Sequence, residues 1–157
     1  MKIAIIGSGI SGMMTAWMLR ERGCDITLFD KQHPGQESSW AGGGIVSPLY
    51  PWRYADSVTR IAKASQAVYP ELVNELKAES GIDPEYLRSG LLIFSPEEEE
   101  TAQVWGQRWS MDVETVEPSG ISAIEPGLVC PEPSALWFPE VGQVRNPRIV
   151  KALYTAL

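Results

Sequence analysis

The fold of this chain is decided by Lys2-Ile3-Ala4-Ile5-Ile6-Gly7-Ser8-Gly9-Ile10-Ser11-Gly12, an apolar run that leads into a glycine-rich turn. The apolar run predicts a buried parallel strand over residues 2–6. A helical pattern of apolar residues follows in Met13, Met14, Trp17, Met18 and Leu19. Gly23 predicts the end of that helix, and residues 25–29 predict a second strand. The first thirty residues therefore predict a βαβ unit of the Rossmann type.

The three glycines of the turn have the spacing of a dinucleotide-binding fingerprint. Gly7 permits a tight turn, Gly9 lets the backbone approach a pyrophosphate, and Gly12 lets the helix pack closely on the strand. The N-terminus of the helix favours an anion. Asp30 follows Gly12 by eighteen residues, where its carboxylate can accept hydrogen bonds from ribose hydroxyls. The pattern predicts a bound dinucleotide.

Length and composition agree with this prediction. A chain of 157 residues is long enough to bury one core. Its hydrophobic content of 44% and mean hydropathy of −0.11 are typical of a globular α/β protein. A net charge of −7 without a cluster of Lys or Arg argues against nucleic acid as a partner.

Several further classes of protein are also disfavoured. The first strand begins at residue 2, which leaves no room for a signal peptide, and no apolar run is long enough for a membrane span. Cys24 and Cys130 are too few for a disulfide framework and suit a reducing compartment. With His33 as the single histidine, no metal-ligand cluster is expected. We expect a cytoplasmic protein without a metal site.

The segment over residues 31–55 distinguishes between NAD and FAD. A simple NAD-binding unit usually continues into another helix after a loop of about 2–6 residues. Here Ser38 and Ser39 can begin a short helical turn, and Gly42-Gly43-Gly44 leaves bare backbone against which a flat ring system can lie. The alternative is a flexible surface loop, but the apolar and aromatic residues at 45–54 argue against it. The segment favours FAD.

These residues resemble those of a known family. The N-terminal unit resembles the FAD-binding fingerprint of the D-amino-acid oxidase superfamily. Residues 38–54, Ser-Ser-Trp-Ala-Gly-Gly-Gly-Ile-Val-Ser-Pro-Leu-Tyr-Pro-Trp-Arg-Tyr, are similar to bacterial glycine oxidases of thiamine biosynthesis and to the cyanide-forming glycine dehydrogenase subunit. Residues 89–93, 123–128 and 142–147 fit the same group. The resemblance covers the whole chain, whereas members of the family are more than twice as long.

The resemblance implies a cofactor platform and no catalytic residue within this chain. The pyrophosphate would be bound by Gly7, Ser8, Gly9, Ile10, Ser11 and Gly12. Asp30 and Lys31 would lie by the adenosine ribose, and the flavin would run along Glu37, Ser38, Gly42, Gly43 and Gly44. The loop over residues 48–53 would border the substrate cavity. Its Arg53 either faces that cavity or stacks on Trp52 or Tyr54.

The implied activity is FAD-dependent oxidation of glycine or another small amino acid to an imine, with hydrogen peroxide as the second product. Two alternatives remain open: a flavin dehydrogenase that passes electrons to a carrier, and a truncated nucleotide-binding fragment. The family's substrate-binding arginine would lie past Leu157, and the last helical pattern has no Gly or Asn stop. We therefore expect an N-terminal part that is inactive alone and prone to self-association through an uncovered sheet edge.

We expect two domains. Residues 1–88 and 142–157 would form an incomplete FAD-binding domain, and residues 89–141 part of an α+β substrate domain. In the first, Asp56 predicts the start of a helix over residues 57–80, kinked or split near Pro70. Its predicted buried face is Val58, Ile61, Ala62, Ser65, Val68, Leu72 and Leu76. Gly81 would end this helix, and Asn146-Pro147 would begin the final one.

The substrate part is predicted to contain short strands over residues 90–95, 113–117 and 135–138, and a short helix over 118–124. Ser95-Pro96-Glu97-Glu98 predicts a capping box at the start of another helix. The glutamates at 97–100 are then expected to serve the helix start and not a metal or partner. Trp105 and Trp109 are expected on the packed face of that helix.

Overall fold

A computed structural model describes residues 1–129 and 132–157, so Cys130 lies outside the described residues. The chain divides into two compact units. Unit 1 comprises residues 1–44, 68–86 and 143–157, and unit 2 comprises residues 45–67 and 87–142. The expected FAD-binding domain over residues 1–88 and 142–157 and the expected substrate domain over residues 89–141 stay a prediction.

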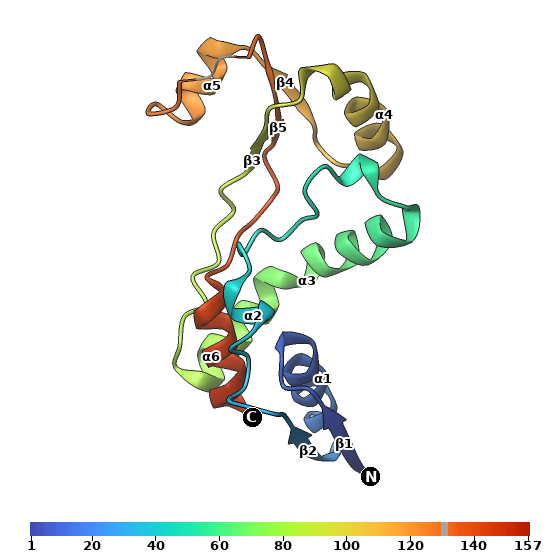
Figure 1. Cartoon of the computed structure of the whole chain (residues 1–157), viewed down its shortest axis with the longest axis vertical. Coiled ribbons are helices and arrows are strands. Elements are labelled where there is room, and N and C mark those ends of the chain that lie inside the picture. The colour runs from blue at the N-terminus through green and yellow to red at the C-terminus, as the bar shows by residue number, and fades with distance from the viewer. Residues whose placement is uncertain (130–131) are drawn as a thin grey trace. The chain divides into compact units, whose positions relative to one another are not determined.

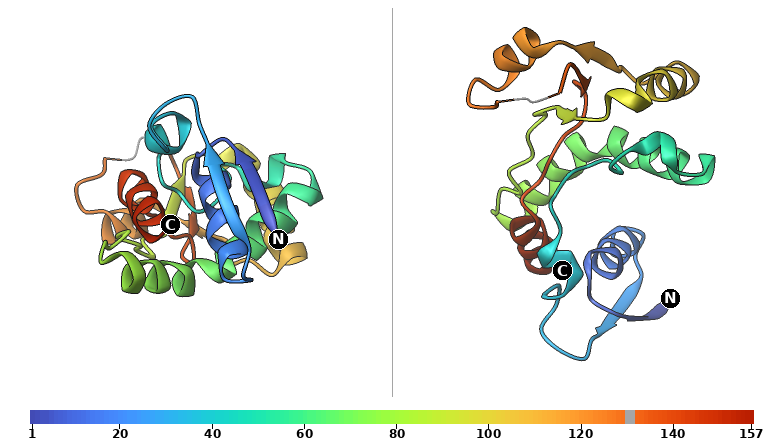
Figure 2. Two further views of the ribbon diagram at one scale, coloured as in Figure 1. Left: turned by 90° about the horizontal axis from the view of Figure 1, so that it is seen from below. Right: turned by 45° about the horizontal axis from the view of Figure 1, so that its top comes forward.

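Unit 1 begins with the expected βαβ unit. Strand β1 (Lys2–Ile6), helix α1 (Ile10–Arg20) and strand β2 (Asp25–Phe29) follow one another along the chain. The strands pair in parallel, with Lys2 opposite Asp25 and Ile6 opposite Phe29. Figure 2 shows the two strands side by side with α1 against one face. The predicted α/β fold class and both strand ranges are confirmed.

The expectation of a buried first strand is wrong. Exposed and half-buried residues alternate along both β1 and β2. Ile6 is 91% exposed and Phe29 is 54% exposed, although both side chains are large and apolar. The reason is that the sheet of unit 1 has two strands and α1 covers one of its faces, whereas a parallel strand becomes fully buried only with cover on both.

The rest of unit 1 packs on the other side of α1. It consists of the short helix α2 (Ser38–Ala41), the part of α3 (Asp56–Ser80) from residue 68, and α6 (Asn146–Ala156). Met13, Ala16, Leu76, Ile149 and Leu153 are fully buried and form the core. At the edge of this core, Glu79 accepts hydrogen bonds from the indole of Trp17 (3.0 Å) and the guanidinium of Arg20 (2.6 Å).

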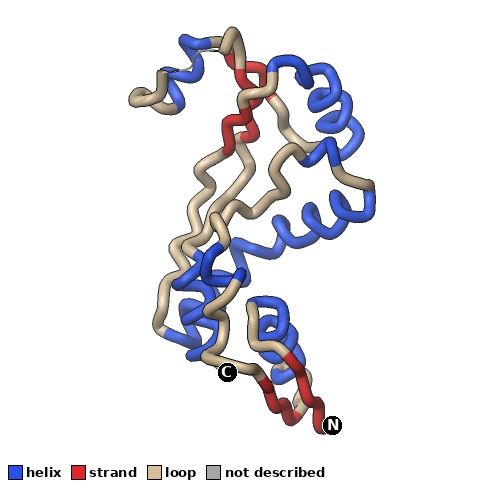
Figure 3. Tube along the Cα trace, in the orientation of Figure 1, coloured by secondary structure: helices blue, strands red, loops and turns tan. Residues whose placement is uncertain are grey.

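Unit 2 contains an antiparallel sheet in the order β3–β5–β4, formed by β3 (Leu91–Ile93), β4 (Glu114–Val116) and β5 (Ala135–Phe138). Figure 3 shows how short these strands are. Its helices are α4 (Glu99–Trp109), α5 (Pro118–Ile124), two 3-10 turns at Pro51–Arg53 and Pro96–Glu98, and the first part of α3 (Figure 1).

The core of unit 2 gathers around Phe138. Ile93, Leu136 and Ala102 are buried beside it, and Trp105 packs against the same cluster from α4. The Trp52 ring stacks on Phe138 with 6.0 Å between ring centroids. The expected packing role of Trp105 is confirmed.

Three local predictions are wrong, in whole or in part. Ser95 makes no side-chain capping bond, and residues 96–98 form a 3-10 turn before α4 begins at Glu99, so the capping box does not form. Helix α3 is continuous through Pro70, so the expected split is wrong, and the expected kink stays a prediction. On its expected buried face Leu76 is buried as predicted, but Val58, Ile61 and Val68 are exposed. Thr59 and Val73, which were not expected on that face, are buried. Which residues of α3 are buried depends on the segments that pack beside it, and the spacing of its own apolar residues does not predict those segments.

Candidate functional site

The glycine turn between β1 and α1 has the geometry that its spacing predicts. Gly7 has a φ of +99°, which is open to glycine at little cost, and its N–H donates to the Phe29 carbonyl at 2.7 Å. A Cβ at Gly12 would lie 1.9 Å from the Gly7 carbonyl oxygen. Gly12 therefore allows α1 to start directly against the turn, with its N-terminus at the carboxyl end of β1.

Asp30 lies at the end of β2 and binds this turn. Its Oδ2 accepts hydrogen bonds from the backbone N–H of Ser8 at 2.6 Å and from the Ser8 hydroxyl at 2.7 Å. The hydrogen bond from the Ser8 hydroxyl has the larger effect and that from the Ser8 N–H the next, and they lower the pKa of Asp30 from 3.8 to about 2. Its Oδ1 accepts a long bond of 3.3 Å from the N–H of Gln32. One carboxylate oxygen thus holds the turn while the other remains available to a ligand.

Ser39 also lies at the glycine turn, although it was not among the residues expected to bind the cofactor. Its hydroxyl oxygen accepts a hydrogen bond from the N–H of Ile10, the first residue of α1, at 2.9 Å. The same oxygen would lie 3.1 Å from a Cβ at Gly9. Ser38 and Ser39 were expected to begin a helical turn, and α2 does begin at Ser38, but neither serine caps it with its side chain. Only the approach of α2 to α1 reveals the role of Ser39.

Lys31 and Glu37 form an ion pair, with 2.6 Å between Nζ and Oε1. The Glu37 carboxylate raises the pKa of Lys31. Both side chains are largely exposed, so the pair adds little to stability. The pair closes the loop between β2 and α2, and it leaves both charged groups within reach of solvent.

The second glycine run, Gly42-Gly43-Gly44, lies against the segment that leads into α6. A Cβ at Gly42 would lie 2.2 Å from Asn146 Nδ2, and one at Gly44 would lie 2.0 Å from the Val144 carbonyl oxygen. Gly43 has no atom within 4 Å of the position of a Cβ. Two of these glycines therefore permit close packing, and Gly43 alone leaves open space.

The remaining predicted residues are peripheral to these contacts. Ser38 and Ser11 are exposed, and the Ser11 carbonyl accepts a hydrogen bond from the Thr15 hydroxyl at 2.8 Å. Ile10 is half-buried. The structure thus brings the glycine turn together with Asp30 and Ser39, joins Lys31 to Glu37, and places Gly42–Gly44 beside Asn146.

An open pocket of about 540 Å³ lies at the carboxyl end of β2 in unit 1. Its lining includes the polar residues Ser8, Asp30 and Gln32 and the apolar or aromatic residues Leu28, Pro34 and Tyr154. In open α/β sheets, ligands bind at the carboxyl ends of the strands. This pocket has the position, volume and mixed polarity of a nucleotide site.

Arg53 in unit 2 is held by two neighbours. Its Nε lies 3.0 Å from both carboxylate oxygens of Glu98, and its guanidinium lies 3.9 Å above the Tyr50 ring. Arg53 lowers the pKa of Glu98, which in turn raises that of Arg53. The expected stacking partners, Trp52 and Tyr54, were wrong, and Glu98 serves more than a helix start. Tyr50 adopts the left-handed region at φ +51°, an unusual conformation for an aromatic residue.

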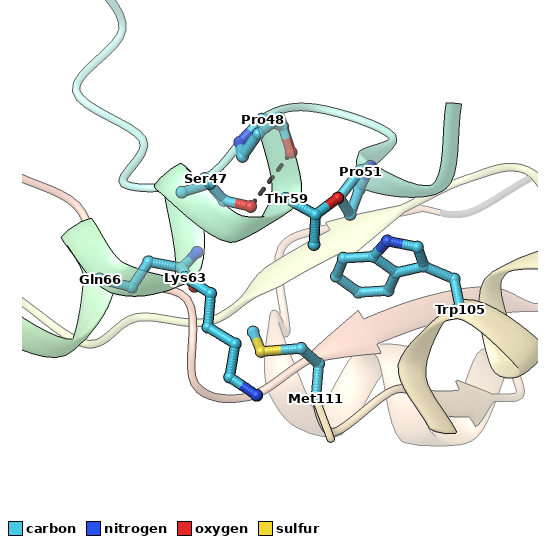
Figure 4. Close-up of a pocket in the computed structure, with 9 residues that line it drawn as sticks. Ser47, Pro48, Pro51, Thr59, Lys63, Gln66, Trp105 and Met111 are labelled. Carbon is cyan, nitrogen blue, oxygen red and sulfur yellow. Dashed lines mark hydrogen bonds between the residues drawn. The ribbon is translucent and has the colours of Figure 1, made fainter. Parts of the chain in front are cut away.

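The loop that contains Arg53 also lines a small cavity in unit 2. Figure 4 shows Pro48 and Pro51 of this loop facing Thr59, Lys63 and Trp105 from helices α3 and α4. The cavity has a volume of about 10 Å³, which is the space of one water molecule and too small for an amino acid.

Two further features are absent from the described residues, a cluster of metal ligands and a helix that could span a membrane. Over residues 1–129 and 132–157 no three His, Cys, Asp or Glu side chains gather as metal ligands, and Cys24 is a free thiol. Within the same ranges no helix has the length and apolar character needed to cross a bilayer. The cytoplasmic location stays a prediction.

Comparison with known proteins agrees with this geometry. A family model described as DAO, FAD dependent oxidoreductase, matches residues 2–157. The chain is 40% identical over 156 residues to glycine oxidase of Pseudomonas putida and 38% identical to that of Pseudomonas aeruginosa, covering 99% of this chain and 43% of each relative. The crystal structure of glycine oxidase from Bacillus cereus matches with a TM-score of 0.88 at 27% identity, over 99% of this chain and 43% of that one. The chain spans less than half the length of these relatives, and it belongs to the DAO family of FAD dependent oxidoreductases.

Proposed function

We propose that this chain forms the FAD-binding part of an amino-acid oxidoreductase of the glycine oxidase type. The observation that carries the proposal is the pocket at the carboxyl end of β2, where Ser8 of the glycine turn and the Asp30 carboxylate lie together. The 40% identity to a glycine oxidase supports FAD as the dinucleotide and glycine or another small amino acid as the substrate.

The residues present fit the cofactor. Helix α1 starts at Ile10, so the N–H groups of Ser11 and Gly12 have no partner within the helix and can bind a pyrophosphate. Asp30 Oδ1 would accept a ribose hydroxyl, with Lys31 beside it. Gly43 leaves open backbone for the flavin, and Glu37, Ser38, Gly42 and Gly44 would flank it. Bound flavin would accept a hydride from the substrate, while the protein supplies binding and orientation.

The cofactor is tested by titration of the purified chain with FAD and with NAD. We expect one FAD per chain, retained on desalting and visible as flavin absorption, and no comparable binding of NAD. Asp30→Asn should weaken FAD binding by about 1–3 kcal/mol, since the charge that strengthens the hydrogen bonds is lost. Asp25→Asn, at the opposite end of β2, is the matched control and should have no effect. Stoichiometric NAD binding by a chain that does not retain FAD would contradict the proposal.

The substrate class is tested in a hybrid in which residues 1–157 replace the corresponding part of Pseudomonas putida glycine oxidase. We expect the hybrid to bind FAD and to form peroxide with glycine, sarcosine or D-alanine. A hybrid that binds FAD and reduces a dye with these substrates, but forms no peroxide, would identify a dehydrogenase. A hybrid that binds FAD and oxidises none of them would contradict the proposed substrate class.

We also propose that the chain alone, mixed with FAD and glycine, forms no more peroxide than free flavin does. Recognition of a substrate carboxylate needs a fixed cation, and Arg53 is already neutralised by Glu98. Peroxide above the free-flavin level would show that the chain contains a complete substrate site. Self-association stays a further prediction. It is supported by the exposed Ile6 and Phe29 on the sheet of unit 1 and is measurable by sedimentation.

A further inference from the structure

Tyr154 occupies an unusual place for a large aromatic residue. It lies on α6 and lines the pocket at the carboxyl end of β2, yet it is 52% exposed. One neighbour is aromatic, since the His33 ring centroid lies 5.6 Å from that of Tyr154 with the planes tilted by 49°. The Tyr154 ring is therefore supported by a second ring and still accessible from the pocket.

The wall that holds this ring is built by close packing. Gly35 is buried in the same loop as His33, and a Cβ there would lie 2.3 Å from Val150 Cγ1 on α6. The absence of a side chain at Gly35 brings the loop onto α6, so that His33 reaches Tyr154. Because the loop and the helix meet at this point, His33 contacts Tyr154 beside the pocket.

The lining of the pocket is mixed in polarity. It includes the polar residues Ser8, Asp30 and Gln32 and the apolar or aromatic residues Met13, Leu28 and Tyr154. A nucleotide whose phosphate lies at the α1 N-terminus and whose ribose lies at Asp30 must place its base beyond the ribose. Tyr154 lines the same pocket as Asp30, and its accessible aromatic ring is the kind of surface on which a flat purine stacks.

We propose that Tyr154 is the residue on which the adenine base of the bound dinucleotide stacks, with His33 supporting its ring. This inference rests on the proposed function, because it assumes a dinucleotide in the pocket. It adds an assignment that the glycine fingerprint does not contain: the base is selected by α6, far along the chain from the turn that binds the phosphates. The expected ligand is the adenosine half of the cofactor, and the flavin half does not contact Tyr154.

The test uses the chain itself and ADP, followed by calorimetry, with inorganic pyrophosphate as the ligand that lacks the base. Tyr154→Ala should weaken ADP binding roughly 5- to 150-fold, the range found when a stacking aromatic residue is removed. Tyr154→Phe keeps the ring and should bind ADP within about twofold of wild type. Pyrophosphate binding should be unchanged in both variants. Thr155→Ala, an exposed neighbour on α6 outside the pocket, is the matched control.

A second measurement does not depend on variants. In the wild-type chain with labelled tyrosines, ADP should shift the ring resonances of Tyr154, and pyrophosphate or FMN should not. ADP binding that is unchanged in Tyr154→Ala, or that leaves the Tyr154 resonances in place, would overturn the inference while the proposed function stands. A wild-type chain that binds neither ADP nor pyrophosphate would overturn both.

Discussion

The two glycine runs of unit 1 look alike in sequence and differ in what requires them. In the first, a Cβ at Gly12 would meet the carbonyl of Gly7, a residue of the same turn. In the second, Cβ atoms at Gly42 and Gly44 would meet Asn146 and Val144, about a hundred residues further along the chain. The first run is required by local backbone geometry, and the second by a tertiary contact. Composition alone does not distinguish these cases.

The largest expected effect comes from Gly12→Ala. The added Cβ would lie 1.9 Å from a backbone oxygen that cannot move without opening the turn. We expect a loss of about 3 kcal/mol or more in the free energy of unfolding, measured by urea denaturation. Gly43→Ala is the matched control, because its Cβ meets nothing within 4 Å and its φ lies outside the left-handed region. It should change stability by no more than about 0.5 kcal/mol. Equal losses of unfolding free energy in Gly12→Ala and Gly43→Ala would contradict the proposed difference between the two glycine runs.

An intermediate effect is expected from Gly42→Ala, whose Cβ would lie 2.2 Å from the Asn146 side chain. We expect a loss of about 1–2 kcal/mol. Because the added Cβ would meet a side chain, Asn146→Ala should restore part of the lost stability. A double-mutant cycle should give a coupling of about 1 kcal/mol between the two positions.

Gly44→Ala should also destabilise the chain, but, unlike Gly42→Ala, it should not be rescued by a second substitution. Its Cβ would meet the backbone oxygen of Val144, and its φ of +77° is strained for alanine, so no side-chain substitution should rescue it. Additive effects of Gly42→Ala and Asn146→Ala would show that the second run does not depend on this contact.

The smallest expected effect concerns the carboxylate of Asp30, which binds Ser8 in the first glycine run. Because the folded-state pKa of Asp30 is lowered from 3.8 to about 2, its contribution to stability is fully present above about pH 4. It is lost as the pH falls from there through 2. Carboxyl NMR should give a pKa of about 2 in wild type. Ser8→Ala removes the hydroxyl bond and should raise that pKa towards 3.8, whereas Ser11→Ala, an exposed serine of the same turn, should not. An unchanged pKa in Ser8→Ala would show that the hydroxyl does not hold the carboxylate.

Much of the local structure was predictable, because its causes lie close together in sequence. Gly23 ends the turn after α1, residues 118–124 form a helix behind Pro118, and residues 135–138 form a strand, as their patterns indicate. Ser95 shows where such reasoning fails. Its sequence matches a capping box, but its φ of −150° and ψ of 66° leave the side chain without a capping bond.

The βαβ unit, the glycine turn and the position of Asp30 follow from local sequence, because short-range sterics and the alternation of apolar residues act within thirty residues. Packing between distant segments brings Ser39 to the start of α1, pairs Arg53 with Glu98, and places Tyr154 in the lining of the pocket beside Asp30. Each of these contacts joins residues that are at least twenty-nine positions apart. The packing of helices and loops brings these residues together, and no local sequence pattern predicts that packing.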